Sequence, residues 1–267
     1  ALFWQACMDP SLWYFLGAVS MIVVIGVIDD FRPLCAKQRF LLQALTAGIL
    51  CWQGKVLLLN FGNLIGFGDI VLSPALALLI TPVAMIGVIN AINMLDGVDG
   101  LAASLVFQAL CWIAGLMAVT HITTYWVICL SALASILAYL CLNFPWRANK
   151  PAVLFMGDAG SMLLGLIIVW FAVVLSQRPH QSAPAVLFLW LFALPLYDTG
   201  QVMWKRFRQK KSLFSPDRGH LHHVLLDRGL GVTQVVVQMN VFAFVCAAAG
   251  ACMWTFGVAE HYLMGTF

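Results

Sequence analysis

Charged residues are scarce in this chain. Asp, Glu, Lys and Arg make up 9% of its 267 residues, whereas roughly a quarter of the residues in a soluble domain are charged. Apolar residues make up 63%, and a composition this apolar excludes a water-soluble fold. The start of the chain also lacks the basic, apolar and cleavage-site pattern of a signal peptide. The composition therefore predicts an all-α polytopic membrane protein.

Eight apolar stretches are long enough to cross a bilayer as helices of about 20 residues. They are residues 12–28, 40–59, 71–92, 101–120, 125–142, 161–175, 183–204 and 233–258. Gly54, Pro74 and Pro82 interrupt the second and third stretches, so the ends of these helices can shift by several residues. A broken or re-entrant helix is tolerated there if protein or a cavity covers the freed backbone. The sequence predicts one membrane domain over residues 1–267, built as a bundle of about eight transmembrane helices.

The eight cysteines have no CxxC spacing, and most lie within apolar stretches. This distribution favours buried free thiols over zinc ligands or disulfides.

The few charges are unevenly distributed between the connections. Twelve of the 14 cations lie in the segments 29–39, 143–160 and 205–232, and the opposite connections hold only Lys55 and Arg178. The positive-inside rule places these segments and the 93–100 turn in the cytoplasm. Seven of the 11 acids lie in the same segments. We expect a polar site open to the cytoplasm that binds a highly charged ligand together with a cation, with ordinary loop solvation as the alternative.

The first cluster of polar residues reads VIDDFRPLCAKQR. Asp29 and Asp30 directly follow an apolar stretch, and two adjacent carboxylates repel each other unless a metal ion or protons relieve them. The pair is therefore a candidate for acid/base chemistry or metal contact. Lys37 supplies a point charge that suits phosphate. Two acids that merely end a helix are a weak alternative, since their charge opposes the helix dipole.

The second cluster reads NAINMLDGVDGLAA. Asn90, Asn93, Asp96 and Asp99 recur at intervals of three, which would place them along one side of a continuous helix. Polar groups in an apolar region are costly without partners. We expect them to bind a ligand, with a buried network that only joins helices as the alternative.

The third cluster, FMGDAGSMLLG, places Asp158 between two glycines. A helix that starts at Gly160 and Ser161 would leave backbone N–H groups free to attract an anion, and Asp158 would bring a divalent cation to a phosphate. Phe155 offers a ring for base stacking, although a lone phenylalanine is more commonly a core residue.

The fourth cluster reads FSPDRGHLHHVLLDRG and lies in the most basic connection. Ser215 as N-cap and Pro216 at the first helical position predict a short helix at the membrane interface, with its histidines facing the site. Three histidines among four residues suggest zinc ligands or contacts to a diphosphate. Phosphate contact or acid/base assistance is favoured, because no cysteine lies nearby and Mg²⁺ prefers oxygen ligands.

The four motifs, in this order and separated by apolar stretches, resemble the polyprenyl-phosphate N-acetylhexosamine-1-phosphate transferase family. FSPDRGHLHH is most similar to its bacterial undecaprenyl-phosphate N-acetylglucosamine-1-phosphate transferases. The resemblance implies transfer of N-acetylglucosamine-1-phosphate from UDP-N-acetylglucosamine to undecaprenyl phosphate, with Mg²⁺, or Mn²⁺ as a substitute, and release of UMP. This is a first membrane step of cell-surface polysaccharide synthesis, such as that of O antigen.

The resemblance also implies a bundle of ten or eleven helices in the bacterial inner membrane, with its active site on the cytoplasmic face. The implied partners are the two substrates and the lipid bilayer, without nucleic acid; a homodimer is left open. The implied catalytic residues are Asp29, Asp30, Asp158 and His222. The implied substrate-binding residues are Lys37, Asn90, Asp96, Asp99, Phe155, Arg218, His220 and His223. The implied metal ligands are Asp158 and Asn93.

Two mechanisms are compatible with these motifs. The lipid phosphate oxygen attacks the β-phosphorus directly, with Asp29 to position or deprotonate it, or an aspartate attacks first. The direct route is slightly favoured, because a lipid phosphate with a second pKa near 6 is largely dianionic.

The chain departs from the family pattern in two ways. It reads FRP where relatives often carry a third acid or polar residue after the aspartate pair, and it lacks the family's first helices and their basic loop. We therefore expect a truncated chain. The alternatives are a relative that uses another UDP-sugar, of the phospho-N-acetylmuramoyl-pentapeptide transferase type, and a membrane transporter. HLHH argues against the first. The second would need acids along a mid-membrane path, and Asp198 is the only plausible mid-span acid in the sequence.

Overall fold

The computed structural model describes residues 10–146, 152–177, 183–212 and 219–267, and in these ranges the regular secondary structure is helical apart from one isolated antiparallel bridge between Asn60 and Val71. The predicted all-α class is confirmed. The helices are α2 (Pro10–Phe31), α3 (Ala36–Trp52), α4 (Pro74–Leu95), α5 (Leu101–Val119), α6 (Trp126–Asn143), α7 (Gly157–Ser176), α8 (Ala185–Leu191), α9 (Ala193–Arg208), α10 (Leu221–Asp227), α11 (Val232–Thr255) and α12 (Glu260–Thr266).

Each predicted apolar stretch overlaps a helix or, for residues 183–204, the pair α8 and α9, although α3 ends at Trp52, before the end of the predicted stretch 40–59. Within the described ranges, six helices are long and apolar enough to cross a membrane: α2, α4, α5, α6, α7 and α11. The pair α8 and α9, bent by 80°, would be a seventh. The 17 residues of α3 fall short of a span. The structure therefore confirms a polytopic membrane protein but not the expected number of about eight spans.

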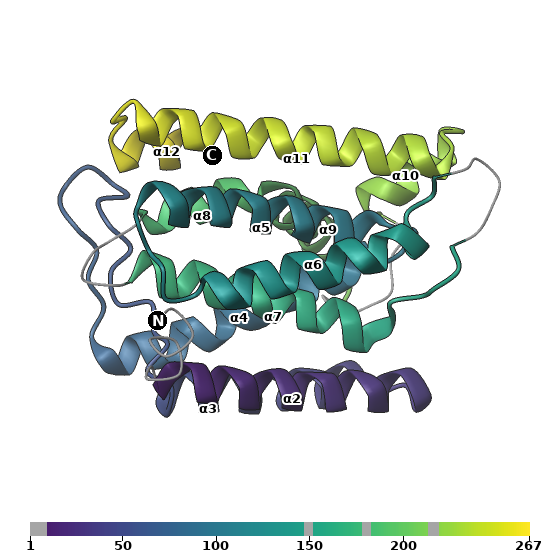
Figure 1. Ribbon diagram of the computed structural model, residues 1–267, viewed down its shortest axis with the longest axis horizontal. Helices are drawn as coiled ribbons and strands as arrows, with labels where there is room; N and C mark the ends of the chain where they lie inside the picture. The colour runs from purple at the N-terminus through teal and green to yellow at the C-terminus, as the bar shows by residue number, and fades with distance from the viewer. Residues whose placement is uncertain (1–9, 147–151, 178–182, 213–218) are drawn as a thin grey trace.

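Helix α7 lies at the centre of the bundle and is the most buried of the six candidate spans (Figure 1). It packs against α2, α4 and α5. Two glycines allow close approach, because a Cβ atom on Gly26 would lie 2.2 Å from the Ala159 Cα and one on Gly165 would lie 2.6 Å from the Ile89 Cα. Helices α2 and α4 are thereby each held at a short distance from α7.

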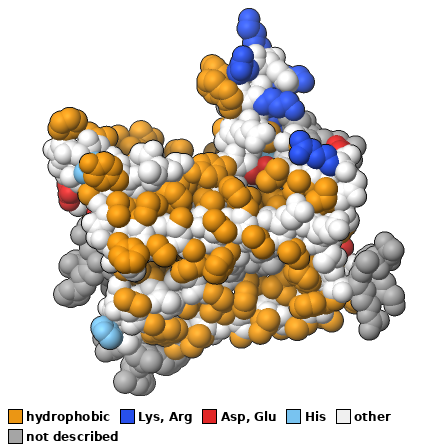
Figure 2. Space-filling view, turned by 90° about the horizontal axis from the view of Figure 1, so that it is seen from above, with side chains coloured by type: hydrophobic (Ala, Val, Ile, Leu, Met, Phe, Trp, Pro, Cys, Tyr) orange, Lys and Arg blue, Asp and Glu red, His pale blue; other side chains and the backbone are white. Residues whose placement is uncertain are grey.

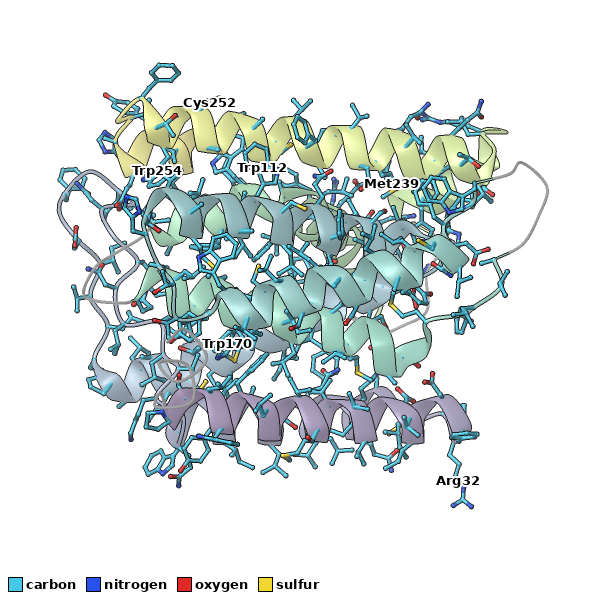
Figure 3. The ribbon with its side chains drawn as sticks, in the orientation of Figure 1. Arg32, Trp112, Trp170, Met239, Cys252 and Trp254 are labelled. Atoms are coloured by element: carbon cyan, nitrogen blue, oxygen red, sulfur yellow. The ribbon has the colours of Figure 1, made fainter. Side chains whose placement is uncertain are left out.

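Aromatic packing fixes the half of the bundle away from the site. Trp170 of α7 stacks on Phe15 of α2 at 4.1 Å between ring centroids and meets Tyr125 edge-on at 5.1 Å. Figure 3 shows Trp170 in the interior, between α2 and the rest of the bundle. Many large apolar side chains point outward instead, and Figure 2 shows them covering the visible face of the bundle. An apolar exterior of this extent suits a protein surrounded by lipid.

The connections lie at two opposite ends of the bundle. The segment 53–73 joins α3 to α4 at one end, where Gln177 accepts hydrogen bonds from the backbone N–H groups of Leu59 and Asn60. The other end holds the loop after α2, the turn after α4 and helix α10 (Figure 1). Of the two prolines in the third apolar stretch, Pro74 begins α4. Pro82 lies inside α4 and does not end the helix.

Candidate active site

The four polar clusters of the sequence meet at one end of the bundle, as predicted. Asp30 contacts the start of α7, Asn93 contacts Asp158, and a Cβ atom on Gly97 would lie 2.7 Å from the Nε2 atom of His222. Residues more than 60 positions apart in the chain thus form one polar surface.

Asp29 is buried, and both of its carboxylate oxygens accept hydrogen bonds. The backbone N–H of Leu34 donates to Oδ1 at 2.6 Å, and the Nη1 atom of Arg39 donates to Oδ2 at 3.0 Å. Arg39 also lies 3.8 Å from Asp158 Oδ1. The repulsion expected between Asp29 and Asp30 is therefore offset by a cation of this chain, which the sequence analysis counted but did not assign to the site.

Asp30 caps the N-terminus of α7 from a different helix. Its two carboxylate oxygens accept hydrogen bonds from the backbone N–H groups of Asp158, at 2.8 Å, and Ala159, at 3.3 Å. The expected start of this helix at Gly160 and Ser161 is wrong. The positive φ of Gly157, +69°, lets the chain turn into the helix three residues earlier, and Asp30 occupies N–H groups that were expected to attract an anion.

Asp158 is tied to α4 through Asn93. The Asn93 side-chain amide donates to Asp158 Oδ1 at 2.5 Å and to Ser161 Oγ at 2.9 Å. About a third of the Asp158 side chain stays exposed, at 34%. The two residues expected to bind a metal ion are therefore neighbours, and the carboxylate is accessible from outside the protein.

Asp96 and Asp99 lie in a turn and not on a helix, so the expected alignment of four polar residues along one helical side is wrong. Helix α4 ends at Leu95, and Gly100 has a φ of +79° that the turn requires. Asn90 is buried one turn deeper in α4, where its amide donates to Gln43 Oε1 at 2.7 Å. This contact joins α4 to α3.

Burial, followed by the charges of Asp158, Asp99 and Asp30 in that order, raises the pKa of Asp96 to about 7. These carboxylates therefore create a strongly negative potential beside Asp158. A bound cation would relieve their mutual repulsion.

Asn143 is a buried residue that the sequence analysis missed. Its Oδ1 atom accepts a hydrogen bond from Gly100 N at 2.7 Å, and its Nδ2 atom donates to Leu154 O at 2.6 Å. A second link runs from Ala152 N to Asp99 Oδ2, at 3.2 Å. These bonds hold the 96–100 turn against the segment that leads into α7. The only sequence signal was an amide at the end of an apolar stretch.

The histidine segment lies against the same turn. His222 is buried, and neither of its ring nitrogens has a hydrogen-bond partner in the described part of the chain. Burial, together with His223 and His220 and against the opposing charge of Asp198, lowers the pKa of His222 to about 4. Asp198 of α9 accepts from Leu221 N at 2.6 Å and lies 2.7 Å from His220 Nδ1.

Other predicted residues lie at the edge of the site or outside the described ranges. Lys37 is exposed in the first turn of α3. Phe155 is 78% exposed, so it is not a core aromatic, and it borders a pocket of about 330 Å³ with Tyr139 and Leu164. His223 is half-buried, with its ring 4.2 Å from that of His222. The predicted start of the histidine helix after Ser215 is wrong, because α10 begins at Leu221 and His220, in extended conformation, is its N-cap. Ser215, Pro216 and the predicted ligand Arg218 themselves lie outside the described residues.

The residues that form this site lie in a region that matches a known protein family. The sequence model of glycosyl transferase family 4 matches residues 12–176, a range that contains Asp29, Asp30, Asn93 and Asp158. The chain belongs to glycosyl transferase family 4.

Similar proteins extend this family likeness beyond α7. An undecaprenyl-phosphate alpha-N-acetylglucosaminyl 1-phosphate transferase of Escherichia coli is 32% identical over 241 residues, which cover 90% of this chain and 65% of that protein. The protein of the same name from Pasteurella multocida is 32% identical over 266 residues, which cover 99% of this chain and 73% of the relative. The chain thus spans about two thirds of the length of the curated relatives it matches.

The donor groups of this family 4 chain fit a magnesium ion better than a zinc ion. In the described ranges no three His, Cys, Asp or Glu side chains are close enough to enclose a metal. Mg²⁺ does not need such a cage, because it usually retains several waters and binds one or two carboxylates together with substrate phosphates. The Asp158 carboxylate and the Asn93 amide oxygen, beside other carboxylates, are ligands of that kind.

Proposed function

We propose that the protein transfers N-acetylglucosamine-1-phosphate from UDP-N-acetylglucosamine to undecaprenyl phosphate. An oxygen of the lipid phosphate forms a bond to the β-phosphorus of the nucleotide, and the bond from that phosphorus to the bridging oxygen breaks. The products are UMP and undecaprenyl-diphospho-N-acetylglucosamine. The observation that carries this proposal is the meeting of Asp30, Asn93 and Asp158, from three different helices, at one end of the bundle. The similarity of the chain to undecaprenyl-phosphate alpha-N-acetylglucosaminyl 1-phosphate transferases supports it.

Asp158 and Asn93 would hold the Mg²⁺ ion. When bound, the ion would neutralise the phosphate charge that builds up during transfer. Asp30 positions Asp158 by capping the first turn of α7, and Asn93 orients the Asp158 carboxylate. The position of the metal ligand thus depends on contacts among α2, α4 and α7.

Direct attack by the lipid phosphate agrees better with the surroundings of Asp29 than attack by that carboxylate. Asp29 is buried, and both of its oxygens are engaged by Leu34 and Arg39. A lipid phosphate with a second pKa of about 6 is already largely ionised at neutral pH. Asp29 would then act as a positioning residue that holds Arg39 near Asp158.

Of the remaining predicted residues, one group would contact the nucleoside and the other would contact the diphosphate and sugar of UDP-N-acetylglucosamine. Exposed Phe155 is available to stack on uracil, and the turn with Asp96 and Asp99 would border the nucleoside. The cations and histidines would hold the diphosphate and sugar: Lys37, Arg218, His220, His222 and His223. Because His222 stays neutral at pH 7, it would contribute as a hydrogen-bonding group and not as a cation.

The membrane orientation follows from charge. The sequence segments that contribute to the site, 29–39, 143–160 and 205–232, also hold most of the cations of the chain, which would place the site in the cytoplasm of a bacterial inner membrane. UDP-N-acetylglucosamine would enter from that side, while undecaprenyl phosphate would approach from the bilayer.

The proposal is tested by UMP release from the purified full-length protein in detergent with undecaprenyl phosphate. We expect UMP with UDP-N-acetylglucosamine and Mg²⁺ and none after chelation of the metal. No UMP from intact, folded protein would refute the proposal. Release only with UDP-N-acetylmuramoyl-pentapeptide would assign the chain to the other substrate class.

A further inference from the structure

The end of α9 and the residues after it extend away from the bundle. We call residues 203–212 the α9 arm. The 80° bend between α8 and α9 turns this helix out of the direction of the spans, and Figure 2 shows Lys and Arg side chains gathered on a projection from the bundle. Trp204 and Phe207 are exposed at 62% and 67%. The proposed reaction uses none of these residues.

The arm carries a concentrated positive charge. Lys205, Arg208, Lys210 and Lys211 are all exposed, and the sequence has no acid between Asp198 and residue 212. No ion pair links these four cations to a carboxylate within the described ranges, where Asp198 is engaged by His220 and Leu221. Their charge is therefore available to an anionic partner.

Aromatic rings lie next to these cations. The rings of Trp204 and Phe207 are 6.0 Å apart and inclined by 27°. Trp204 and Phe207 are three residues apart, as are Lys205 and Arg208, so the two pairs form neighbouring stripes about 100° apart around the helix. A helix with aromatic residues on one stripe and cations on the next is typical of segments that lie in a membrane interface.

We propose that the α9 arm binds the headgroups of anionic phospholipids on the side of the membrane that borders the site. The aromatic rings would lie at the level of the headgroups and upper acyl chains, and the cations would contact lipid phosphates. An anionic bilayer is the partner favoured by charge complementarity, since four cations lack described counter-ions. This inference does not depend on the proposed transfer reaction.

The test is the retention of lipid by the purified full-length protein, measured by native mass spectrometry from micelles with equal amounts of phosphatidylglycerol and phosphatidylcholine. The variant is Lys205→Gln/Arg208→Gln/Lys211→Gln, and the matched control is Arg32→Gln/Lys55→Gln/Arg228→Gln, which removes three exposed cations elsewhere. We expect the arm variant to lose about tenfold or more of the preference for phosphatidylglycerol and the control to lose less than about twofold. Thermal unfolding checks that both variants are folded.

Two further measurements use the same assay. Raising the ionic strength from about 0.1 M to about 1 M shortens the screening length from about 10 Å to about 3 Å, so the preference of the unaltered protein should fall. Trp204→Ala/Phe207→Ala should weaken retention of both lipids alike.

Three results would overturn the proposal. An arm variant with an unchanged lipid preference would do so, and so would a control that loses as much preference as the arm variant. An arm variant that changes only the proportion of dimer, at equal lipid retention, would instead assign the arm to a second copy of this chain.

Discussion

The carboxylates of the site differ in the groups that hold them. Asp29 is paired with Arg39, Asp30 caps α7, and Asp158 accepts from Asn93 while staying partly exposed. Asp96 is surrounded by other acids, which help to raise its pKa to about 7. Adjacent or regularly spaced aspartates in the sequence thus have distinct roles, and Asp158 is the one best placed to meet a metal ion and a phosphate.

Phe155 is the residue that we expect to contact uracil. Phe155→Ala should raise the KM for UDP-N-acetylglucosamine by about tenfold, since loss of base–aromatic stacking costs about 1–3 kcal/mol, and should leave the KM for the lipid nearly unchanged. Val153→Ala is the matched control, because Val153 is equally exposed at 78% in the same segment. An equal rise of both KM values would indicate that Phe155 has a packing role.

His222 should make the stability of the protein depend on pH. Its pKa is lowered from 6.5 to about 4 in the folded protein by burial and by His223 and His220, with Asp198 opposing. The unfolded chain therefore binds more protons between these values, so stability should fall by about 3 kcal/mol as the pH falls from about 6.5 to about 4.

The measurement is the thermal unfolding midpoint in detergent across this pH range. His222→Gln should flatten the curve, and His121→Gln, at an exposed position, should not. An unchanged slope in the His222 variant would show that other groups cause the pH dependence.

At the scale of the helices, the close crossing of α2 and α7 brings Asp30, near the end of α2, next to Asp158, at the start of α7. Gly26→Ala would bring a Cβ atom within 2.2 Å of the Ala159 Cα, one residue from Asp158. Overpacking of this kind costs typically about 1–3 kcal/mol. We expect Gly26→Ala to lower both the unfolding midpoint and turnover.

Gly17→Ala is the control for this crossing. Gly17 lies in the same helix, and a Cβ atom there has nothing within 4 Å. Because alanine is favoured over glycine in a helix, Gly17→Ala should be neutral or slightly stabilising. Equal losses in the two variants would contradict the importance of the α2–α7 contact.

Helices were easier to predict from the sequence than their ends. Apolar length located every long helix, because burial in lipid or protein requires it. The start of α7 and the end of α4 depend instead on Gly157 and on the turn at Gly100, which are set by contacts with Asp30 and Asn143. Such contacts join distant parts of the chain, and a local pattern does not contain them.

At the scale of the whole molecule, the distribution of charge predicted that four separate segments would share one end of the bundle. The structure confirms this meeting through Asp30, Asn93 and Gly97. The sequence did not identify Arg39, Asn143 or Asp198 as partners at the site, because their importance follows from tertiary hydrogen bonds. Membership of glycosyl transferase family 4 agrees with the residues that converge there.

The most direct test of the central claim compares UMP release by two aspartate variants of the full-length protein. Asp158→Asn removes a charge at the meeting point of α2, α4 and α7, and Asp69→Asn removes one from the exposed segment at the opposite end. We expect Asp158→Asn to reduce kcat by about 10³-fold or more, with an unchanged unfolding midpoint, and Asp69→Asn to retain near-normal turnover. Near-normal UMP release by folded Asp158→Asn would contradict the assignment of this end of the bundle as the active site.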